Sequence, residues 1–130
     1  MNKTIRITLV LITYVLLAGC ARAQTSPAGK VVEAYFQAIA AGDAESAAGV
    51  SCAEWQETSR DEVASFAGVK AKLENLSCRV AANNDSEATV DCSGFIVATY
   101  VDQEMRFDLS GRQYRVAQQD GKWLLCGYVQ

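Results

Sequence analysis

Val32 to Asp43, with the sequence VEAYFQAIAAGD, has the pattern of an amphipathic helix followed by its end. Its apolar side chains recur at three- and four-residue steps, as in Tyr35, Phe36 and Ile39, and they therefore share one face of a helix of about four turns. Gly42 suits the end of such a helix, because glycine readily adopts the left-handed conformation found there. The pattern predicts a helix whose apolar face packs against the rest of the fold.

The residues around this helix predict its start and the helices that follow. Ser26 and Pro27 suit an N-cap and a first turn. Asp43 suits the cap of a second, alanine-rich helix from Ala44 to about Ala48. A third helical segment is expected in residues 53–60, in residues 61–66, or in both.

After about residue 73 the apolar pattern changes from a helical period to the period of two that is typical of strands. Asn84 to Ser86, Asp102-Gln103 and Asp120-Gly121 are turn signals that divide this region. The strands predicted between the turns cover residues 76–80, 88–101, 105–116 and 123–129. The sequence therefore predicts an α+β fold in which N-terminal helices pack on a curved four-stranded antiparallel meander.

The register of this meander predicts a bend in the sheet. If Asp102-Gln103 is a two-residue loop, Val101 faces Glu104, and Gly94 then lies opposite Gly111. Two facing glycines inside long strands are typical of a bulge or a sharp bend. The apolar parity of both strands also shifts at these glycines, so we expect a strongly curved sheet.

The first 20 residues have the pattern of an export signal. Lys3 and Arg6 precede an almost wholly apolar run from Ile7 to Ala18, which is shorter than the roughly 20 residues that a membrane-spanning helix needs. The run ends in Leu17-Ala18-Gly19-Cys20, which resembles the lipobox of bacterial lipoproteins. In that family the signal is cut just before the cysteine, and the cysteine is acylated. The resemblance implies a signal peptide over residues 1–19, a lipid bilayer anchor at Cys20, a short tether over residues 20–26 and an NTF2-like domain, described below, over residues 27–130.

An ordinary secretory signal with an incidental cysteine is the alternative interpretation. Two or more acyl chains hold a protein stably at a membrane, whereas one chain binds only marginally. Ala21 stands where some Gram-negative lipoproteins have an aspartate that retains them at the inner membrane. The resemblance therefore implies the outer membrane, facing the periplasm, in a Gram-negative cell, and the single membrane in a Gram-positive cell.

Removal of residues 1–19 leaves 111 of the 130 residues, enough for one small domain. The chain has 12 basic and 15 acidic side chains, and the loss of Lys3 and Arg6 leaves 10 and 15, a net charge of −5. This balance argues against nucleic acid and anionic lipid headgroups as partners, since both favour a basic surface.

Four cysteines remain after Cys20, namely Cys52, Cys78, Cys92 and Cys126. An even number in an exported domain predicts two disulfides, and the sequence allows three pairings. Buried free thiols and a metal site are the alternatives, but the chain has no histidine and no Cys-x-x-Cys pair, so neither a metal nor another cofactor is expected. A three-residue loop at Asn84 to Ser86 would place Cys78 opposite Cys92, which favours the pairs Cys78–Cys92 and Cys52–Cys126.

Two motifs in the folded part resemble a known family. The stretch from Val32 to Asp43 is similar to the first helix of NTF2-like (cystatin-like) proteins, and Asp120-Gly121-Lys122-Trp123 is similar to the start of their last strand. The resemblance covers about residues 27–129. It implies a cone in which the sheet wraps around the first helix and leaves a pocket, and many relatives form homodimers through the open sheet. Function does not follow from it, because this fold hosts enzymes, binding proteins and assembly domains.

Some members of that family, such as ketosteroid isomerase and the SnoaL-type cyclases, place an acid–base residue in the pocket. Histidine, the commonest catalytic base, is absent here. The remaining candidates are Glu33, Tyr35, Asp91 and Asp108. Glu33 is expected on the solvated face of the first helix, Tyr35 belongs to the apolar stripe, and the two aspartates alternate with apolar neighbours and should face solvent. The sequence has no nucleophile–base pair, phosphate loop or metal-ligand set, and it therefore predicts that the domain is not an enzyme.

Aromatic residues with polar tips are the candidates for a binding pocket. They are Tyr35, Trp55, Tyr100, Tyr114, Trp123 and Tyr128. Each of them can instead simply fill the core. Arg112 and Arg115, on the strand that carries Tyr114, could receive an anionic group or only solvate an outer face.

The leading hypothesis is a membrane-anchored, non-catalytic NTF2-like domain of the bacterial cell envelope that binds a protein partner or a small apolar ligand. One alternative is an enzyme that uses an in-pocket carboxylate as acid or base. Another is a structural lipoprotein or one that forms a homodimer. A roomy cavity without titratable residues would favour the first, a buried carboxylate in an apolar cavity the second, and a closed, filled cone the third.

Overall fold

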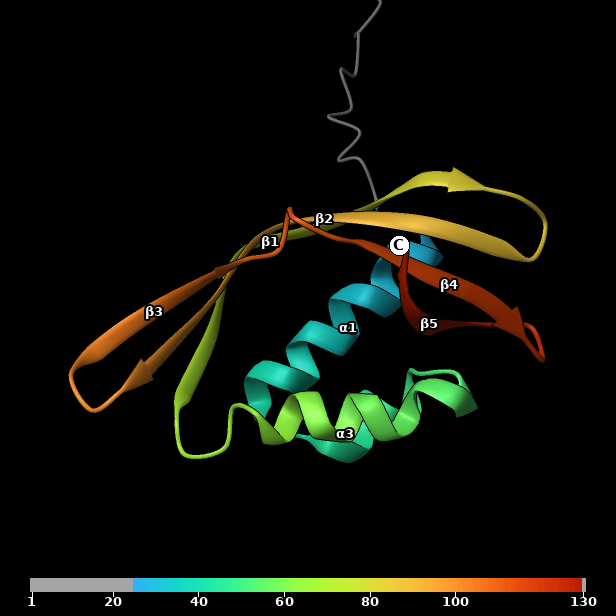
Figure 1. Ribbon diagram of the computed structural model, residues 1–130. Coiled ribbons are helices and arrows are strands. Elements are labelled where there is room, and N and C mark those ends of the chain that lie inside the picture. Colours follow the sequence, from blue (N-terminus) through green and yellow to red (C-terminus); the bar gives the residue numbers. More distant parts are fainter. Residues whose placement is uncertain (1–24, 130) are drawn as a thin grey trace, which may run out of the picture.

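The computed structural model describes residues 25–129. Its elements in chain order are α1 (Pro27–Ala41), α2 (Ala44–Gly49), the short 3₁₀ helix η1 (Ala53–Trp55), α3 (Gln56–Ala64), β1 (Lys70–Asn83), β2 (Glu87–Tyr100), β3 (Gln103–Asp108), β4 (Gln113–Gln119) and β5 (Lys122–Val129) (Figure 1). Within this range, none of the helices has the length and apolar character required to cross a membrane. Cys20 and the predicted signal peptide over residues 1–19 lie outside the described residues.

Helix α1 begins and ends where the sequence predicts. The Ser26 side chain accepts a hydrogen bond from the backbone N–H of Gly29 at 3.2 Å. At the other end Gly42 has a φ of 70° and donates its N–H to carbonyl groups of the last turn. Val32 and Tyr35 on the apolar face are 0 % exposed, so this face forms the centre of the core.

The strands form one antiparallel sheet in the order β1-β2-β4-β5, with β3 paired to β2 alone. Residues 87–91 of β2 pair with β4, and residues 95–100 of β2 pair with β3. The predicted α+β fold class is confirmed. The single strand expected over residues 105–116 is instead two strands, separated by residues 109–112, so the sheet has five strands rather than four.

The sheet curves over α1, which packs against β1, β2 and β5, and α3 crosses below α1 on the same side (Figure 1). The hairpin formed by β2 and β3 extends past the helices. Tyr100 and Val101 at its tip are 59 % and 77 % exposed. The helices therefore cover only part of the inner face of the sheet.

The predicted bend occurs at Gly94, but the predicted register is wrong by two residues. The loop between β2 and β3 is Val101-Asp102, so Tyr100 pairs with Gln103 and Gly94 does not face Gly111. The turn starts one residue earlier than expected because Val101 adopts a left-handed φ of 55°.

Gly94 bends the sheet where it lies against a bulge in β1. Its φ is 108°, and a Cβ there would lie 2.6 Å from the carbonyl oxygen of Glu74 and 2.7 Å from that of Asn75. The register between β1 and β2 shifts at this point, between Glu74 and Ser77. On its other side Gly94 accepts a hydrogen bond from the backbone N–H of Leu109 at 3.0 Å. This backbone conformation and this close approach both favour glycine.

Both cysteine pairs lie at disulfide-bonding distance. Cys78 and Cys92 face each other across β1 and β2, with Cα atoms 4.1 Å apart, and a three-residue loop at 84–86 joins these strands. Cys52 and Cys126 have Cα atoms 5.0 Å apart. Cys52 also donates its backbone N–H to the carbonyl of Leu125 at 2.7 Å, so this pair ties the segment after α2 to β5. These are the two pairs that the sequence favours.

Gly94→Ala should lower the free energy of unfolding by roughly 3 kcal/mol, because the new methyl group meets two carbonyl oxygens and the backbone remains left-handed. Gly111→Ala is the matched control, since no atom lies within 4 Å of a Cβ at that position. Its effect should be below about 1 kcal/mol. Urea denaturation followed by circular dichroism measures both variants. Equal losses of stability would contradict the role assigned to Gly94.

Candidate functional site

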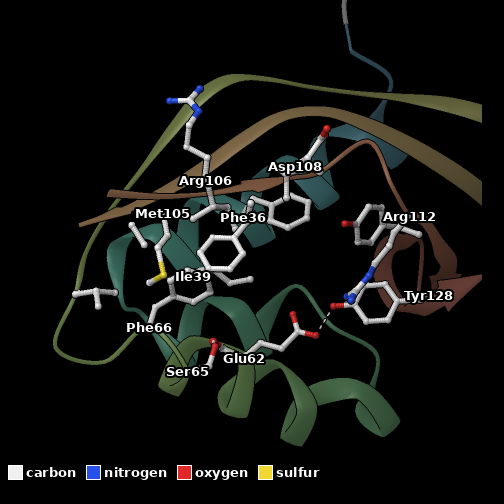
Figure 2. Close-up of a pocket in the computed structure, with 16 residues that line it drawn as sticks. Phe36, Ile39, Glu62, Ser65, Phe66, Met105, Arg106, Asp108, Arg112 and Tyr128 are labelled. Atoms are coloured by element: carbon white, nitrogen blue, oxygen red, sulfur yellow. Dashed lines mark hydrogen bonds between the residues drawn. The ribbon is translucent and has the colours of Figure 1, made fainter. Parts of the chain in front are cut away.

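An open pocket of about 740 Å³ lies between α1, the end of α3 and the sheet (Figure 2). Pockets of this size accommodate small organic molecules. Most of its wall is apolar, and α1, α3 and strands β2 to β5 all contribute side chains to it. The lining side chains are Phe36 and Ile39 of α1, Glu62 of α3, Ser65, Phe66 and Val69 after it, Ile96 and Ala98 of β2, Met105, Arg106, Phe107 and Asp108 of β3, and Leu109, Arg112, Tyr114 and Tyr128.

Aromatic contacts hold the walls of this pocket together. Phe36 of α1 packs edge-to-face against Tyr114 of β4, with ring centroids 5.3 Å apart. Phe66, just after α3, packs in the same manner against Phe107 of β3 at 5.7 Å. Phe107 is nevertheless 43 % exposed. Strand β3 is therefore a pocket wall against which the rest of the protein packs on one side only.

Glu62 places a carboxylate in this largely apolar wall (Figure 2). The Tyr35 hydroxyl donates a hydrogen bond to Glu62 Oε2 at 2.6 Å, and the Tyr128 hydroxyl donates one to Oε1. Tyr35 comes from α1 and Tyr128 from β5, so the two bonds join three elements at one side chain. Both carboxylate oxygens therefore accept a hydrogen bond.

Small polar side chains fix the helix that carries Glu62. The hydroxyl oxygens of Ser51 and Ser59 are buried and lie 2.7 Å apart, which connects the segment after α2 to α3. The Ser59 hydroxyl also donates to the carbonyl of Trp55 at 2.9 Å. Glu62 follows Ser59 by three residues and therefore lies on the same face of the helix.

Three tyrosines around Glu62 keep their protons to unusually high pH. Burial, and then the hydrogen bond to Glu62, raises the pKa of Tyr35 and that of Tyr128 well above the ordinary value. Burial also raises the pKa of Tyr114 to about 12, although the nearby Arg112 acts in the opposite direction. At neutral pH these phenols are therefore hydrogen-bond donors and not bases.

Arg112 lies at the edge of the pocket, between β3 and β4. Its guanidinium carbon is 4.8 Å from the centroid of the Tyr128 ring, a cation–π contact. Within residues 25–129 it forms no ion pair. Arg106, in contrast, lies 2.7 Å from Glu74 and 3.6 Å from Glu104. Arg112 is thus a positive group that a ligand entering the pocket would meet.

One group of side chains in the described region has the spacing of a metal site, namely Cys52, Glu54 and Cys126. Its two sulfur atoms belong to a pair at disulfide-bonding distance, and a metal binds the thiolate form of cysteine. Glu54 is exposed and lies 4.0 Å from Arg115, which also donates to the carbonyl of Cys126 at 3.2 Å. With its cysteines oxidised, this group is not suited to a metal.

Three of the six aromatic residues that the sequence predicts for a pocket lie at this pocket. Tyr114 and Tyr128 line it. Tyr35 is fully buried behind the wall and acts on the pocket through its hydrogen bond to Glu62.

The other three aromatic candidates lie elsewhere. Trp55 packs behind the pocket, with its ring centroid 5.2 Å from that of Tyr128. Trp123, at the start of β5, is partly buried against the core. Tyr100 is exposed on the β2–β3 hairpin. None of these three is among the lining residues.

The acid–base candidates proposed from the sequence are engaged in structural hydrogen bonds. Glu33 accepts from the backbone N–H of Cys78 at 3.0 Å, so it is not simply solvated. Asp91 accepts from the side chain of a neighbouring glutamine at 2.8 Å. Asp108 does reach the pocket rim, where hydrogen bonds from Ser110 hold its pKa below the usual range.

Glu62 is the functional candidate that the sequence analysis missed. A signal for it exists, because Ser59 and Glu62 are three residues apart and share a helix face, and Phe66 continues the same spacing just after the helix. The uncertain bounds of the third helix concealed this face. The helix covers residues 56–64, across the two ranges expected from the sequence.

No protein-family model matches this chain, and no curated protein matches it in sequence. Solved structures resemble it in fold. A variant of Rv3472 from Mycobacterium tuberculosis, a protein of unknown function, is 18 % identical with a TM-score of 0.59, over 76 % of this chain and 65 % of that one. This chain therefore spans slightly less than two thirds of that protein.

Two further structures support the same fold. RPA3114 from Rhodopseudomonas palustris, a SEC-C motif-containing protein, is 12 % identical with a TM-score of 0.53, over 84 % of this chain and 83 % of that one. A proposed scytalone dehydratase from Novosphingobium aromaticivorans is 15 % identical with a TM-score of 0.50, over 74 % of each chain. Helices packed on an open antiparallel sheet of five strands give the domain the cystatin-like, or NTF2-like, α+β fold. Identities this low show the fold and not the activity.

Alkaline pH should destabilise the domain through its buried tyrosines. Their pKa is raised in the folded protein above the ordinary value of about 10, so the folded state holds protons that the unfolded state releases. The free energy of unfolding should be insensitive to these groups below about pH 10 and should fall as pH rises towards 12. Urea denaturation between pH 8 and pH 11 measures this dependence.

Tyr128→Phe removes one of these phenols and should make the alkaline fall less steep. Tyr100→Phe, at an exposed ring, is the matched control and should leave the slope as it is. The same slope in the unaltered chain and in Tyr128→Phe would contradict the expectation.

Proposed function

We propose that this domain binds a small, largely apolar ligand in the pocket between α1, α3 and the sheet, without transforming it. An open, mostly apolar space of about 740 Å³ with a few fixed polar groups has the usual character of a ligand site. Protein interiors are otherwise close-packed, and an unfilled space costs stability. A purely structural role would be served best by a closed fold whose interior is filled with side chains. The open pocket therefore supports ligand binding better than a structural role.

The observation that carries this proposal is Glu62 held between Tyr35 and Tyr128. Placing a carboxylate in an apolar wall is unfavourable unless hydrogen bonds satisfy it. The chain supplies those bonds from two distant elements, which keeps the group at the pocket surface. A carboxylate has about four lone-pair sites, so after two tyrosine bonds Glu62 can still accept from a ligand.

Recognition is favoured over catalysis by the other titratable groups at the pocket. The pKa of Tyr114 is raised to about 12, and the pKa of Asp108 is lowered by Ser110. Both shifts move the pKa away from neutral pH, whereas proton transfer works best with a pKa near the working pH. Glu62 thus has no evident acid–base partner among the lining residues.

Glu62 nevertheless supports a second candidate function, acid–base catalysis on the bound ligand. A carboxylate in an apolar pocket, positioned by hydrogen bonds, is an arrangement that enzymes use. The two functions differ in the fate of the ligand. A binding protein releases the ligand unchanged, whereas an enzyme releases a product. If this domain is an enzyme, Glu62→Gln should abolish turnover of the ligand.

The pocket should bind N-phenyl-1-naphthylamine, an apolar fluorophore that is uncharged at neutral pH and emits more strongly outside water. Val69→Trp fills the pocket from its lining and should weaken binding at least about tenfold, through lost space for the probe. Fluorescence titration of the mature chain, residues 20–130 with Cys20→Ala, measures the affinity.

Val129→Trp is the matched control for this titration. Val129 is 41 % exposed on β5 and does not line the pocket, so the same substitution there should leave the affinity unchanged. Equal losses in both variants, or an unaltered chain that does not bind the fluorophore, would contradict the proposed function.

We also propose that acylated Cys20 holds the domain at a membrane of the bacterial envelope, on the strength of the lipobox resemblance. Only residues 21–26 separate this cysteine from α1, a reach of about 25 Å when fully extended. The pocket would thus lie near the membrane surface. The exposed β2–β3 hairpin is the surface at which an envelope protein or a second copy of the chain would bind.

Protein purified from its native membrane should lack residues 1–19 and carry acyl chains on Cys20. Intact mass measurement detects both changes, and reduction should add the mass of about four hydrogen atoms if both cysteine pairs are disulfides. Cys20→Ala should release the chain from the membrane fraction. An uncut or unacylated chain in native membranes would overturn the anchor.

A further inference from the structure

The carboxylate of Glu62 has no positive partner in the described part of the chain. Across residues 25–129, none of the ion pairs includes it. The groups that it contacts, the hydroxyls of Tyr35 and Tyr128, carry no charge. Glu62 is half-buried, and a charge that is partly removed from water is stabilised by a nearby opposite charge. A ligand that brings a positive charge would complete this site.

The walls around Glu62 also suit a cation. The aromatic side chains that line the pocket are Phe36, Phe66, Phe107, Tyr114 and Tyr128. The faces of aromatic rings attract organic cations, and a set of such rings is the usual arrangement for recognising amines. The guanidinium of Arg112 already lies 4.8 Å from the centroid of the Tyr128 ring, so the other rings are the ones open to a positive group.

The surrounding charges favour a cation over an anion. Asp108 adds a second carboxylate at the rim, and Arg106 is paired with acidic neighbours. The chain after residue 19 has a net charge of −5, obtained from 10 basic and 15 acidic side chains, which attracts cations from a distance. Arg112 acts in the opposite direction, because it would repel a cation bound at Glu62.

We infer that the pocket binds an amphiphilic organic amine, with its ammonium group at Glu62 and its apolar body against Ile39, Phe66 and Met105. These three side chains lie on the side of the pocket away from Arg112 and Tyr128 (Figure 2). A primary ammonium group can donate to the lone-pair sites of the carboxylate that the tyrosines leave free, so both tyrosine bonds remain. This inference rests on the proposed function and specifies the class of ligand.

Three probes of nearly equal size test the inference: 4-phenylbutylamine, 4-phenyl-1-butanol and 4-phenylbutyrate. Their head groups are cationic, neutral and anionic at pH 7, and their apolar bodies are alike. Isothermal titration of the mature chain, residues 20–130 with Cys20→Ala, should give about tenfold tighter binding for the amine than for the alcohol, because a charge-assisted hydrogen bond is the stronger one. The carboxylate should bind most weakly.

Two variants identify the residues responsible. Glu62→Gln keeps the size of the side chain and removes its charge, so the amine should lose about tenfold in affinity and the alcohol much less. Arg112→Gln removes the opposing cation and should tighten amine binding about threefold. Arg112 is exposed between two strands, so its variant decides the question if Glu62→Gln does not fold.

The outcomes separate this inference from the proposed function. Equal affinities for amine and alcohol, tightest binding of the carboxylate, or no binding of any of the three would overturn the inference, provided that N-phenyl-1-naphthylamine still binds. Absence of naphthylamine binding would overturn the proposed function itself.

Discussion

The bend at Gly94 is the constraint on which the pocket depends. At this residue β2 changes its partner, from β4 to β3. The left-handed backbone and the close approach to the β1 bulge at Glu74 and Asn75 allow the change of direction. β3 then forms a wall of its own instead of continuing into β4, and Phe107 on this wall can meet Phe66 from the helical layer. The pocket is the space that these two layers leave between them.

The polar centre of the pocket is a product of the tertiary structure alone. Tyr35 and Tyr128 lie 27 and 66 residues from Glu62 in the sequence, yet both donate to its carboxylate. Under the proposed function, the same hydrogen bonds hold the carboxylate ready for a ligand.

Features set by neighbouring residues could be predicted from the sequence, and features set by distant contacts could not. The end of α1 at Gly42 and the presence of a turn at 84–86 follow from local signals. The register of β3 was missed because Val101 adopts a left-handed conformation that β-branched residues rarely take. Glu62 was missed because its direction depends on how α3 is seated, which the buried contact of Ser59 with the preceding segment decides. The fold was thus largely predictable, while the pocket was predictable only in its tyrosines, Asp108 and Arg112.

The Cys52–Cys126 pair has a mechanical consequence. The two cysteines are 74 residues apart, and the segment between them includes α3 and β1 to β4. When they are covalently joined, a pull applied between residues 25 and 129 travels along α1, through the sulfur atoms and out along the end of β5. Glu62, Phe66 and Phe107 lie inside the loop, which the covalent path bypasses, whereas Phe36 of α1 lies on that path. Tension would therefore act first on α1 and on the pocket wall that Phe36 provides.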